Sequence, residues 1–263
     1  MNLPTTRLLT TTAIIPLLIL VSAIGAWGQT TQTDVTVHVI SKGAKFIGSG
    51  VGGARVKIYN AETGDLLSKG ITTGGSGNTK RIMKSKHDRE KVLSTTDAAG
   101  FSTSLWLEEP TRLKITAFGP LNHKDDANTA TVTTKVYPGK DLNGGDGVLI
   151  EIPGFVVDII SPDENYLREG ENKITFEALV TMMCGCSLKP GGIWDSNGYD
   201  ITLDLYKDGE RLKRVPMEYT GTPSHFRSTI ELEERGCYTV YVNAHDPVTG
   251  NTGWEKTACH KLN

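Results

Sequence analysis

The chain has 263 residues, with 28 lysines and arginines against 30 aspartates and glutamates and a formal net charge of −2. This balance leaves no global positive field that would attract nucleic acid or an anionic membrane surface. Hydrophobic residues make up 38% and charged residues 22%, which is an ordinary globular composition. The 29 glycines separate short segments rich in valine, isoleucine and threonine, a pattern typical of all-β proteins.

The N-terminal residues have the layout of a secretory signal peptide. Arg7 precedes an apolar run over residues 13–26, and small residues follow around Gly28. The run holds roughly 14 residues and contains Pro16, whereas a spanning helix needs about 20. We therefore predict a signal peptide over residues 1–28, with an uncleaved anchor as the alternative. The mature chain would then have no transmembrane segment and would be secreted, periplasmic or at the cell surface.

The mature chain divides near Ser161-Pro162. The segment before this point, 156–160, is apolar and strand-like, and the segment after it, 163–172, is polar and charged. Such a change in composition is typical of a domain boundary. We predict an all-β protein with two β-sandwich domains in tandem, over residues 29–160 and 161–263.

The first domain alternates apolar and polar residues with the period of a strand. Ala54, Val56 and Ile58 alternate with polar neighbours. Further on, Asp97 favours the start of a turn, and Gly100 is expected to supply a positive φ at its end. Two later rows also predict strands with one buried face: Phe101, Thr103, Leu105 and Leu107, then Leu113, Ile115 and Ala117.

Two motifs, Gly53–Tyr59 and Thr95–Phe101, resemble the transthyretin-like, or carboxypeptidase-regulatory-like, β-sandwich. That family shows a Gly-Ala-x-Val strand and a later Thr-Asp-x-x-Gly-x-Phe turn; in this chain Phe101 follows Gly100 directly. The resemblance implies a structural or binding module of exported proteins and implies no catalytic residues. The departure from the family is an insertion over residues 73–93, first rich in glycine and serine and then basic.

The basic part of the insertion is a candidate binding loop, because half of residues 80–91 are lysine or arginine. Lys80, Arg81, Lys84 and Lys86 could contact an anionic polymer or surface. No aromatic residue is interleaved with these charges, which favours the alternative of a solvated loop.

The second domain shows several further alternating segments, which predict the strands 172–182, 199–207, 211–219, 224–232, 237–245 and 251–260. The last two, with inward Tyr238, Val240, Val242 and Ala244 and a turn through Asp246 and Gly250, resemble the closing hairpin of bacterial immunoglobulin-like or fibronectin-type domains. The spacing fits a sandwich, and the resemblance extends to architecture alone.

The four cysteines, Cys184, Cys186, Cys237 and Cys259, all lie in the second domain, and an exported chain favours disulfides. Cys237 and Cys259 are equally distant from Val248 at the centre of the hairpin turn, so a regular hairpin would place them opposite each other. We predict that they form a disulfide on the outer face of the sheet.

Cys184 and Cys186 flank a single glycine and follow Met182 and Met183. They predict a disulfide in some connectivity, and crossed pairings remain open. Met182, Cys184 and Cys186 could instead bind a soft metal such as copper, or zinc with further cysteines, or the pair could be a redox dithiol.

Motifs of catalysis are missing from the sequence, which contains no Gly-x-Ser-x-Gly, His-Glu-x-x-His or phosphate-binding glycine loop. Trp194 is either an exposed contact residue on a binding loop or a plug over the sandwich end, and the plug is favoured. We expect a secreted or cell-surface, non-enzymatic binding or structural module without a cofactor. Its expected partner is a protein or polysaccharide of the cell envelope, or a second copy of itself, and not nucleic acid. The alternative is a periplasmic or extracellular copper-binding or redox protein that uses the Cys-Gly-Cys cluster.

Overall fold

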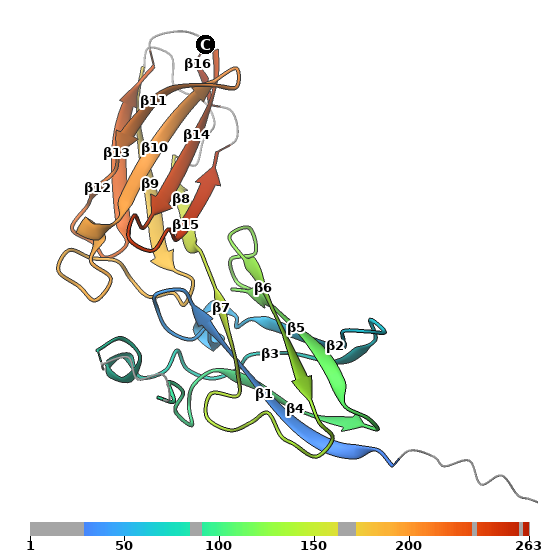
Figure 1. The fold of residues 1–263 in the computed structure, drawn as a ribbon. Coiled ribbons are helices and arrows are strands. Elements are labelled where there is room, and N and C mark those ends of the chain that lie inside the picture. The colour runs from blue at the N-terminus through green and yellow to red at the C-terminus, as the bar shows by residue number, and fades with distance from the viewer. Residues whose placement is uncertain (1–28, 85–90, 163–171, 233–235, 258–259, 263) are drawn as a thin grey trace, which may run out of the picture.

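The computed structural model describes residues 29–84, 91–162, 172–232, 236–257 and 260–262. The predicted signal peptide, residues 1–28, lies outside them. Within the described residues, no helix combines the length and apolarity needed to cross a membrane. The regular structure is almost entirely β, and Figure 1 shows two sandwiches arranged end to end. The predicted all-β class with two tandem sandwiches is therefore confirmed.

The first sandwich packs a three-stranded sheet against a four-stranded sheet. The three-stranded sheet is mixed, because its last strand runs parallel to the central one; its order is β4 (Gly100–Leu107), β1 (Thr31–Ser41) and β7 (Val148–Ile152). The four-stranded sheet is antiparallel, in the order β3 (Leu66–Ile71), β2 (Arg55–Asn60), β5 (Thr111–Gly119) and β6 (Asn128–Val136). Two short helical turns, η1 (Ser49–Val51) and η2 (Lys80–Lys84), lie in loops of the first sandwich.

The second sandwich consists of two sheets, both of them antiparallel. One has the order β11 (Glu210–Pro216), β10 (Asp200–Lys207), β14 (Gly236–His245) and β15 (Thr252–Lys256), with β16 (His260–Leu262) also paired to β14. The other has the order β12 (Glu218–Tyr219), β13 (His225–Glu231), β9 (Lys173–Met182) and β8 (Phe155–Ser161). A short turn, η3 (Ser196–Gly198), precedes β10.

The alternating rows that the sequence predicted face the two cores. In the first sandwich, Leu105, Leu107, Leu113, Ile115 and Ala117 are all buried. In the second, every second residue of β9 and β14 is buried, as a strand with one covered face requires: Ile174, Phe176, Ala178, Val180, Met182, Tyr238, Val240, Val242 and Ala244.

Strand β8 belongs to the second sandwich and not to the first. We predicted the boundary after residue 160, but Phe155 of β8 pairs with Met182 of β9, and the ladder continues to Ser161. The first sandwich thus ends with Ile152, and Pro153-Gly154 forms the link. An apolar strand has the same composition whichever sheet it joins, so its partner and not its sequence decides its domain.

Buried contacts connect the two sandwiches at this link. Met183, which follows β9, is fully buried in the core of the first sandwich, and Ala44 of the first packs in the core of the second. The side chain of Asn251 is 2% exposed; its Oδ1 accepts a hydrogen bond from the Gly154 N–H at 2.6 Å, and its Nδ2 donates to the Gly154 carbonyl at 2.9 Å. Lys42 Nζ also donates to the carbonyl of Thr249. The junction therefore combines apolar packing with satisfied polar groups.

The Cys-Gly-Cys segment forms a tight turn at this junction. Cys184 and Cys186 are joined by a disulfide, and Gly185 has the positive φ of 73° that favours glycine. A side chain at Gly185 would approach Val51 of the first sandwich to 2.7 Å, so the turn lies directly against that sandwich. The disulfide closes the turn from which Met183 enters the first core.

The predicted disulfide between Cys237 and Cys259 was argued from a hairpin register that the structure does not have. Cys237 faces Lys261 and not Cys259 in the β14–β16 ladder. Tyr241 faces Lys256 whereas Tyr238 faces His260, so the returning chain carries one residue more than β14 between these pairs. Such an insertion breaks the equal-distance argument. Cys237 is exposed and disulfide-bonded, but Cys259 lies outside the described residues, and the pairing of the two stays a prediction.

Candidate functional site

A pocket of about 680 Å³ lies where the two sandwiches meet. Three segments form its walls: the β5–β6 loop with residues 122–126 and Asn128, strand β8 with Phe155 and Asp158, and strand β15 with residues 252–256. The pocket thus takes residues from both sandwiches. Clefts between domains are common positions for ligand sites, because side chains from separate units converge there.

Two carboxylates hold the walls together along the free edge of β8. Asp126 Oδ1 accepts a hydrogen bond from the Val157 N–H at 3.1 Å, and Glu255 Oε2 accepts one from the Ile159 N–H. An edge strand leaves such N–H groups without a ladder partner. Asp126 comes from the first sandwich and Glu255 from β15, so both sandwiches contribute to capping this edge.

The pocket concentrates negative charge. The pKa of Asp126 is raised to about 6, first by burial and then by the charges of Asp158 and Glu255, against the opposing effect of the Val157 N–H. Burial, with the charges of Asp158 and Asp125, also raises the pKa of Glu255. His123 Nδ1 lies 3.5 Å from Asp158 Oδ2, and Lys124 and Lys256 also line the pocket and offset part of the negative charge. The arrangement can accept hydrogen bonds from hydroxyl groups and can attract a cation.

We expect the substitution Asp126→Asn to stabilise the protein at pH 8 and to have little effect near pH 4. The folded-state pKa of about 6 exceeds the ordinary value of 3.8, so the protonated form is favoured by folding. This contribution to stability is complete below about pH 4 and is lost as the pH rises through 6. Asparagine remains neutral and keeps an acceptor for Val157. Urea unfolding at both pH values should show a gain of about 1–2 kcal/mol at pH 8, reduced from the full shift because solvent screens part of the carboxyl.

The exposed Asp200 at the start of β10 provides the matched control for this substitution, since Asp200→Asn removes the same charge outside the pocket. A gain of equal size at pH 4 and pH 8 for Asp126→Asn would contradict the assigned origin of the effect, as would a loss of stability at pH 8.

Three side chains of the pocket could hold a metal ion. One ligand atom each from His123, Asp126 and Asp158 lies within 4.8 Å of the others. Imidazole with carboxylates suits a first-row divalent ion such as Zn²⁺ or Mn²⁺. Asp126 already accepts the Val157 N–H, however, so its role in linking the sandwiches explains its position without an ion.

A row of aromatic rings leads to the rim of the pocket across the outer face of the β11-β10-β14-β15 sheet. Tyr206 contacts Tyr241 with ring centroids 5.1 Å apart, and Tyr241 contacts Trp254 at 5.7 Å. Trp254 lines the pocket and is 58% exposed. An indole in this position has one face supported by protein and offers the rest of its surface to a ligand.

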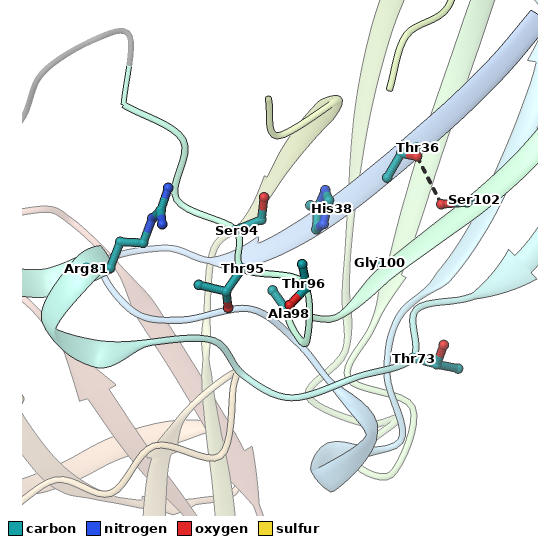
Figure 2. Close-up of a pocket in the computed structure, with 10 residues that line it drawn as sticks. All are labelled: Thr36, His38, Thr73, Arg81, Ser94, Thr95, Thr96, Ala98, Gly100 and Ser102. Carbon is teal, nitrogen blue, oxygen red and sulfur yellow. Dashed lines mark hydrogen bonds between the residues drawn. The ribbon is translucent and has the colours of Figure 1, made fainter. Parts of the chain in front are cut away.

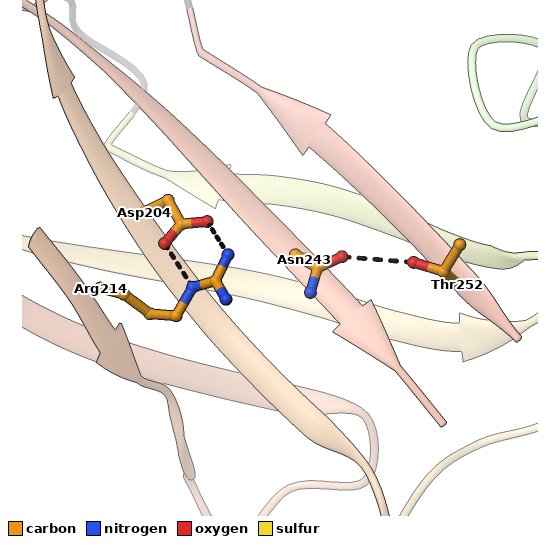
Figure 3. A network of polar contacts seen from close by, with 4 residues as sticks. All are labelled: Asp204, Arg214, Asn243 and Thr252. Atoms are coloured by element: carbon orange, nitrogen blue, oxygen red, sulfur yellow. Dashed lines mark hydrogen bonds and ion pairs between the residues drawn. The ribbon is translucent and has the colours of Figure 1, made fainter. Parts of the chain in front are cut away.

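Polar side chains fix the same outer face (Figure 3). Arg214 forms a bidentate pair with Asp204, with Nε and Nη2 each 2.6 Å from a carboxylate oxygen. Thr252 Oγ1 donates to Asn243 Oδ1, which faces Trp254 across the β14–β15 ladder. Because bidentate arginine–carboxylate pairs have fixed geometry, the sheet beneath the aromatic row is held in one arrangement.

The residues that the sequence analysis selected lie elsewhere. Trp194 is 9% exposed, and its Nε1 donates to the Gly43 carbonyl at 3.0 Å, so it is the plug and not a contact residue of a binding loop. Arg81 lines a separate cavity in the first sandwich, and Lys80 and Lys84 lie beside it in η2. Lys86 lies outside the described residues.

The soft-metal hypothesis requires Cys184 and Cys186 as free thiols, and the structure has them in the oxidised form. Cys184 and Cys186 are joined as a disulfide, and both belong with Met182 to the core of the second sandwich. Soft metals bind the thiolate form of cysteine, so a copper site at this position would first require reduction of the bond.

Sequence reasoning missed the residues of the junction pocket. His123, Asp126, Asp158 and Glu255 lie in segments far apart along the chain, and no spacing motif connects them. One signal was present: Trp254 falls at an outward position of its strand, where a large apolar side chain has no core to enter.

Comparisons with known proteins identify no family. No protein-family model matches the chain, and no curated protein matches it significantly. Among solved structures, it is similar to a DUF3823 family protein from Bacteroides uniformis, with 13% identity, a TM-score of 0.28, and coverage of 88% of this chain and 98% of that one. It is also similar to the fibronectin(III)-like modules of Clostridium thermocellum CbhA, with 13% identity, a TM-score of 0.25, and coverage of 86% and 90%. At these values, function must be inferred from this chain's own residues.

Proposed function

We propose that the protein is a non-enzymatic binding module of the cell exterior and that its ligand is a polysaccharide bound at the junction pocket. The observation that carries the proposal is the exposed indole of Trp254 at the rim of a polar cavity. A sugar ring has an apolar face of C–H groups and a periphery of hydroxyls. The pocket offers a matching aromatic surface beside carboxylate, amide and imidazole groups.

The polar side chains of the pocket suit hydroxyl groups. Asp126 and Asp158 carry acceptor oxygens, the Asn122 and Asn128 amides both donate and accept, and His123 can do either. A sugar hydroxyl also donates and accepts, so several such groups can be satisfied together. A cavity of about 680 Å³ has the size of an ordinary small-ligand site and could receive one or a few sugar units.

The surroundings of the pocket support binding without a large ordering cost. Tyr241 supports the Trp254 ring, and the carboxylates of Asp126 and Glu255 bridge the walls to β8. Sites that are already ordered lose less conformational entropy on binding. A polysaccharide fits better than a protein partner, because stable protein interfaces bury about 800 Å² per partner around an apolar centre, whereas most of the residues that line this pocket are polar or charged.

Location outside the cytoplasm is part of the proposal. The Cys184–Cys186 disulfide and the disulfide-bonded Cys237 favour an oxidising compartment, in agreement with the signal peptide expected from the sequence. The protein would then meet polysaccharides in the periplasm, at the cell surface or in the medium.

We expect Trp254→Ala to weaken polysaccharide binding by tenfold or more, since the stacking surface is lost. The measurement is an array of immobilised polysaccharides followed by titration of the best ligand. Trp106→Ala is the matched control, because Trp106 is 64% exposed on β4 of the first sandwich and lies away from the pocket. Equal binding by the wild type and Trp254→Ala would contradict the proposal. Release of reducing sugar ends from the bound polymer would contradict its non-enzymatic part.

A further inference from the structure

A second cavity, of about 650 Å³, lies in the first sandwich on the side of the three-stranded sheet that faces away from its core (Figure 2). Its floor comes from β1 and β4, with Thr36 and His38 beside Gly100 and Ser102. Its walls come from Thr73 and Arg81 of the insertion over residues 73–93, and from residues 94–96 and Ala98, which follow the insertion. The cavity is separate from the junction pocket and shares no lining residue with it.

The described wall of the cavity is rich in hydroxyls and carries one guanidinium, that of Arg81. Six of its ten described lining residues are serine or threonine, two are Arg81 and His38, and none carries a carboxylate. Hydroxyls can donate to anionic oxygens, and a guanidinium matches the spacing of two oxygens of one oxyanion. The absence of acidic side chains from the described wall distinguishes this cavity from the junction pocket, where carboxylates prevail.

One residue, Asp146, holds two walls of the cavity in place. Its carbonyl lies 2.9 Å from His38 Nδ1, which must carry the proton because a carbonyl only accepts. Its carboxylate accepts the N–H groups of Leu93 and Ser94 at 2.7–3.0 Å. Burial raises the pKa of Asp146, but these N–H groups outweigh it and the pKa lies below the usual range, so the carboxylate that anchors the wall is ionised.

Arg81 and His38 face the cavity from opposite sides for identifiable reasons. Arg81 Nε donates to the Val92 carbonyl at 2.6 Å, which orients the guanidinium along the wall. The second nitrogen of His38, Nε2, lies beside Gly100, where an added Cβ would approach it to 3.1 Å. Glycine at this position therefore keeps the imidazole edge open toward the cavity.

We propose that this cavity binds a tetrahedral oxyanion, namely the sulfate or phosphate ester group of an anionic glycan, with Arg81 as the principal cationic contact. Thr96 and Ser102 supply hydroxyl donors. The hydroxyl of Thr95 already donates to Asp97 Oδ1, and that of Ser94 already bonds to the Asp146 carboxylate. Lys80 and Lys84 on η2 would attract the remainder of an anionic chain. The site does not depend on the function proposed for the junction pocket, and either can fail without the other.

The test is calorimetric titration of the mature protein with sodium sulfate and sodium phosphate, against sodium chloride at equal ionic strength. The expected result is saturable binding of the tetrahedral ions that Arg81→Gln weakens by about tenfold or more. Lys114→Gln is the control for loss of charge, because Lys114 is exposed on β5 in the opposite sheet. Gly100→Ala should also weaken binding by placing a methyl group beside His38 Nε2, and it keeps the test valid if Arg81→Gln does not fold.

Two results would overturn the proposal. One is the absence of saturable binding of sulfate or phosphate beyond the effect of chloride, and the other is equal affinity for the Arg81→Gln, Gly100→Ala and Lys114→Gln variants. Competition with dextran sulfate separates the sources of the ion. Displacement of sulfate by dextran sulfate but not by dextran supports an ester group on a glycan, whereas no displacement by either polymer refutes the glycan assignment.

Discussion

Replacing Asn251 with alanine should destabilise the protein by about 3 kcal/mol, because it leaves two buried backbone groups without partners. The Asn251 side chain is 2% exposed and forms both hydrogen bonds to the N–H and C=O of Gly154, the link between the sandwiches. Alanine can replace neither bond, and the buried position leaves no ready access for water. The midpoint of urea unfolding measures the loss.

The comparison for this substitution is Asn243→Ala in the same hairpin. Asn243 accepts only a long hydrogen bond of 3.4 Å from Thr252, on the outer face of the sheet. Its replacement should change stability by no more than about 0.5 kcal/mol. Equal effects of the two substitutions would show that the Asn251–Gly154 contact does not hold the junction.

The substitution Met183→Ala should cost about 3 kcal/mol. Met183 follows a strand of the second sandwich but is fully buried in the core of the first, so its removal leaves a cavity between the two units. We also expect faster proteolysis at the link Pro153-Gly154, since the packing that covers it is reduced.

The matched substitution is Met83→Ala, because Met83 is a methionine that is only half-buried; it packs at the margin of a small cluster of the first sandwich and at the margin of the second core. It should cost about 1 kcal/mol and leave proteolysis at the link unchanged. If Met183→Ala is no more costly than Met83→Ala, or leaves the link as resistant as in the wild type, the coupling of the sandwiches through Met183 is refuted.

Local alternation predicted most strands, because each has one buried face and the period of two is visible in a few residues. The rows through Ile115 and Phe176 are examples, and both lie in the expected cores. A turn near Asp97 was predicted correctly, since the Ala98 N–H donates to the Thr95 carbonyl. The predicted role of Gly100 was wrong, because Gly100 is the first residue of β4 and is not among the glycines with a positive φ. The strands and the turn depend on neighbouring residues alone.

Features that depend on long-range pairing could not be predicted in the same way. The apolar segment that forms β8 fitted either sandwich, and only its ladder with β9 assigns it to the second. The predicted register of Cys237 was wrong because the returning chain has one additional residue between β15 and β16. Counting residues on either side of the turn does not reveal such an insertion. The junction pocket combines three distant segments around residues 123, 158 and 255, and its chemistry exists only after both sandwiches have docked.

The central claim is that Trp254 and the junction pocket bind a sugar, and side-chain NMR of Trp254 and Trp106, which are both exposed, tests it most directly. The indole N–H signals of Trp254 and Trp106 can be assigned from the Trp254→Ala and Trp106→Ala variants and followed during titration with oligosaccharides of the best polymer. The account predicts a saturable shift of the Trp254 signal, with the Trp106 signal unchanged. A saturable shift at Trp106 alone, or binding that leaves the Trp254 signal where it was, would contradict it.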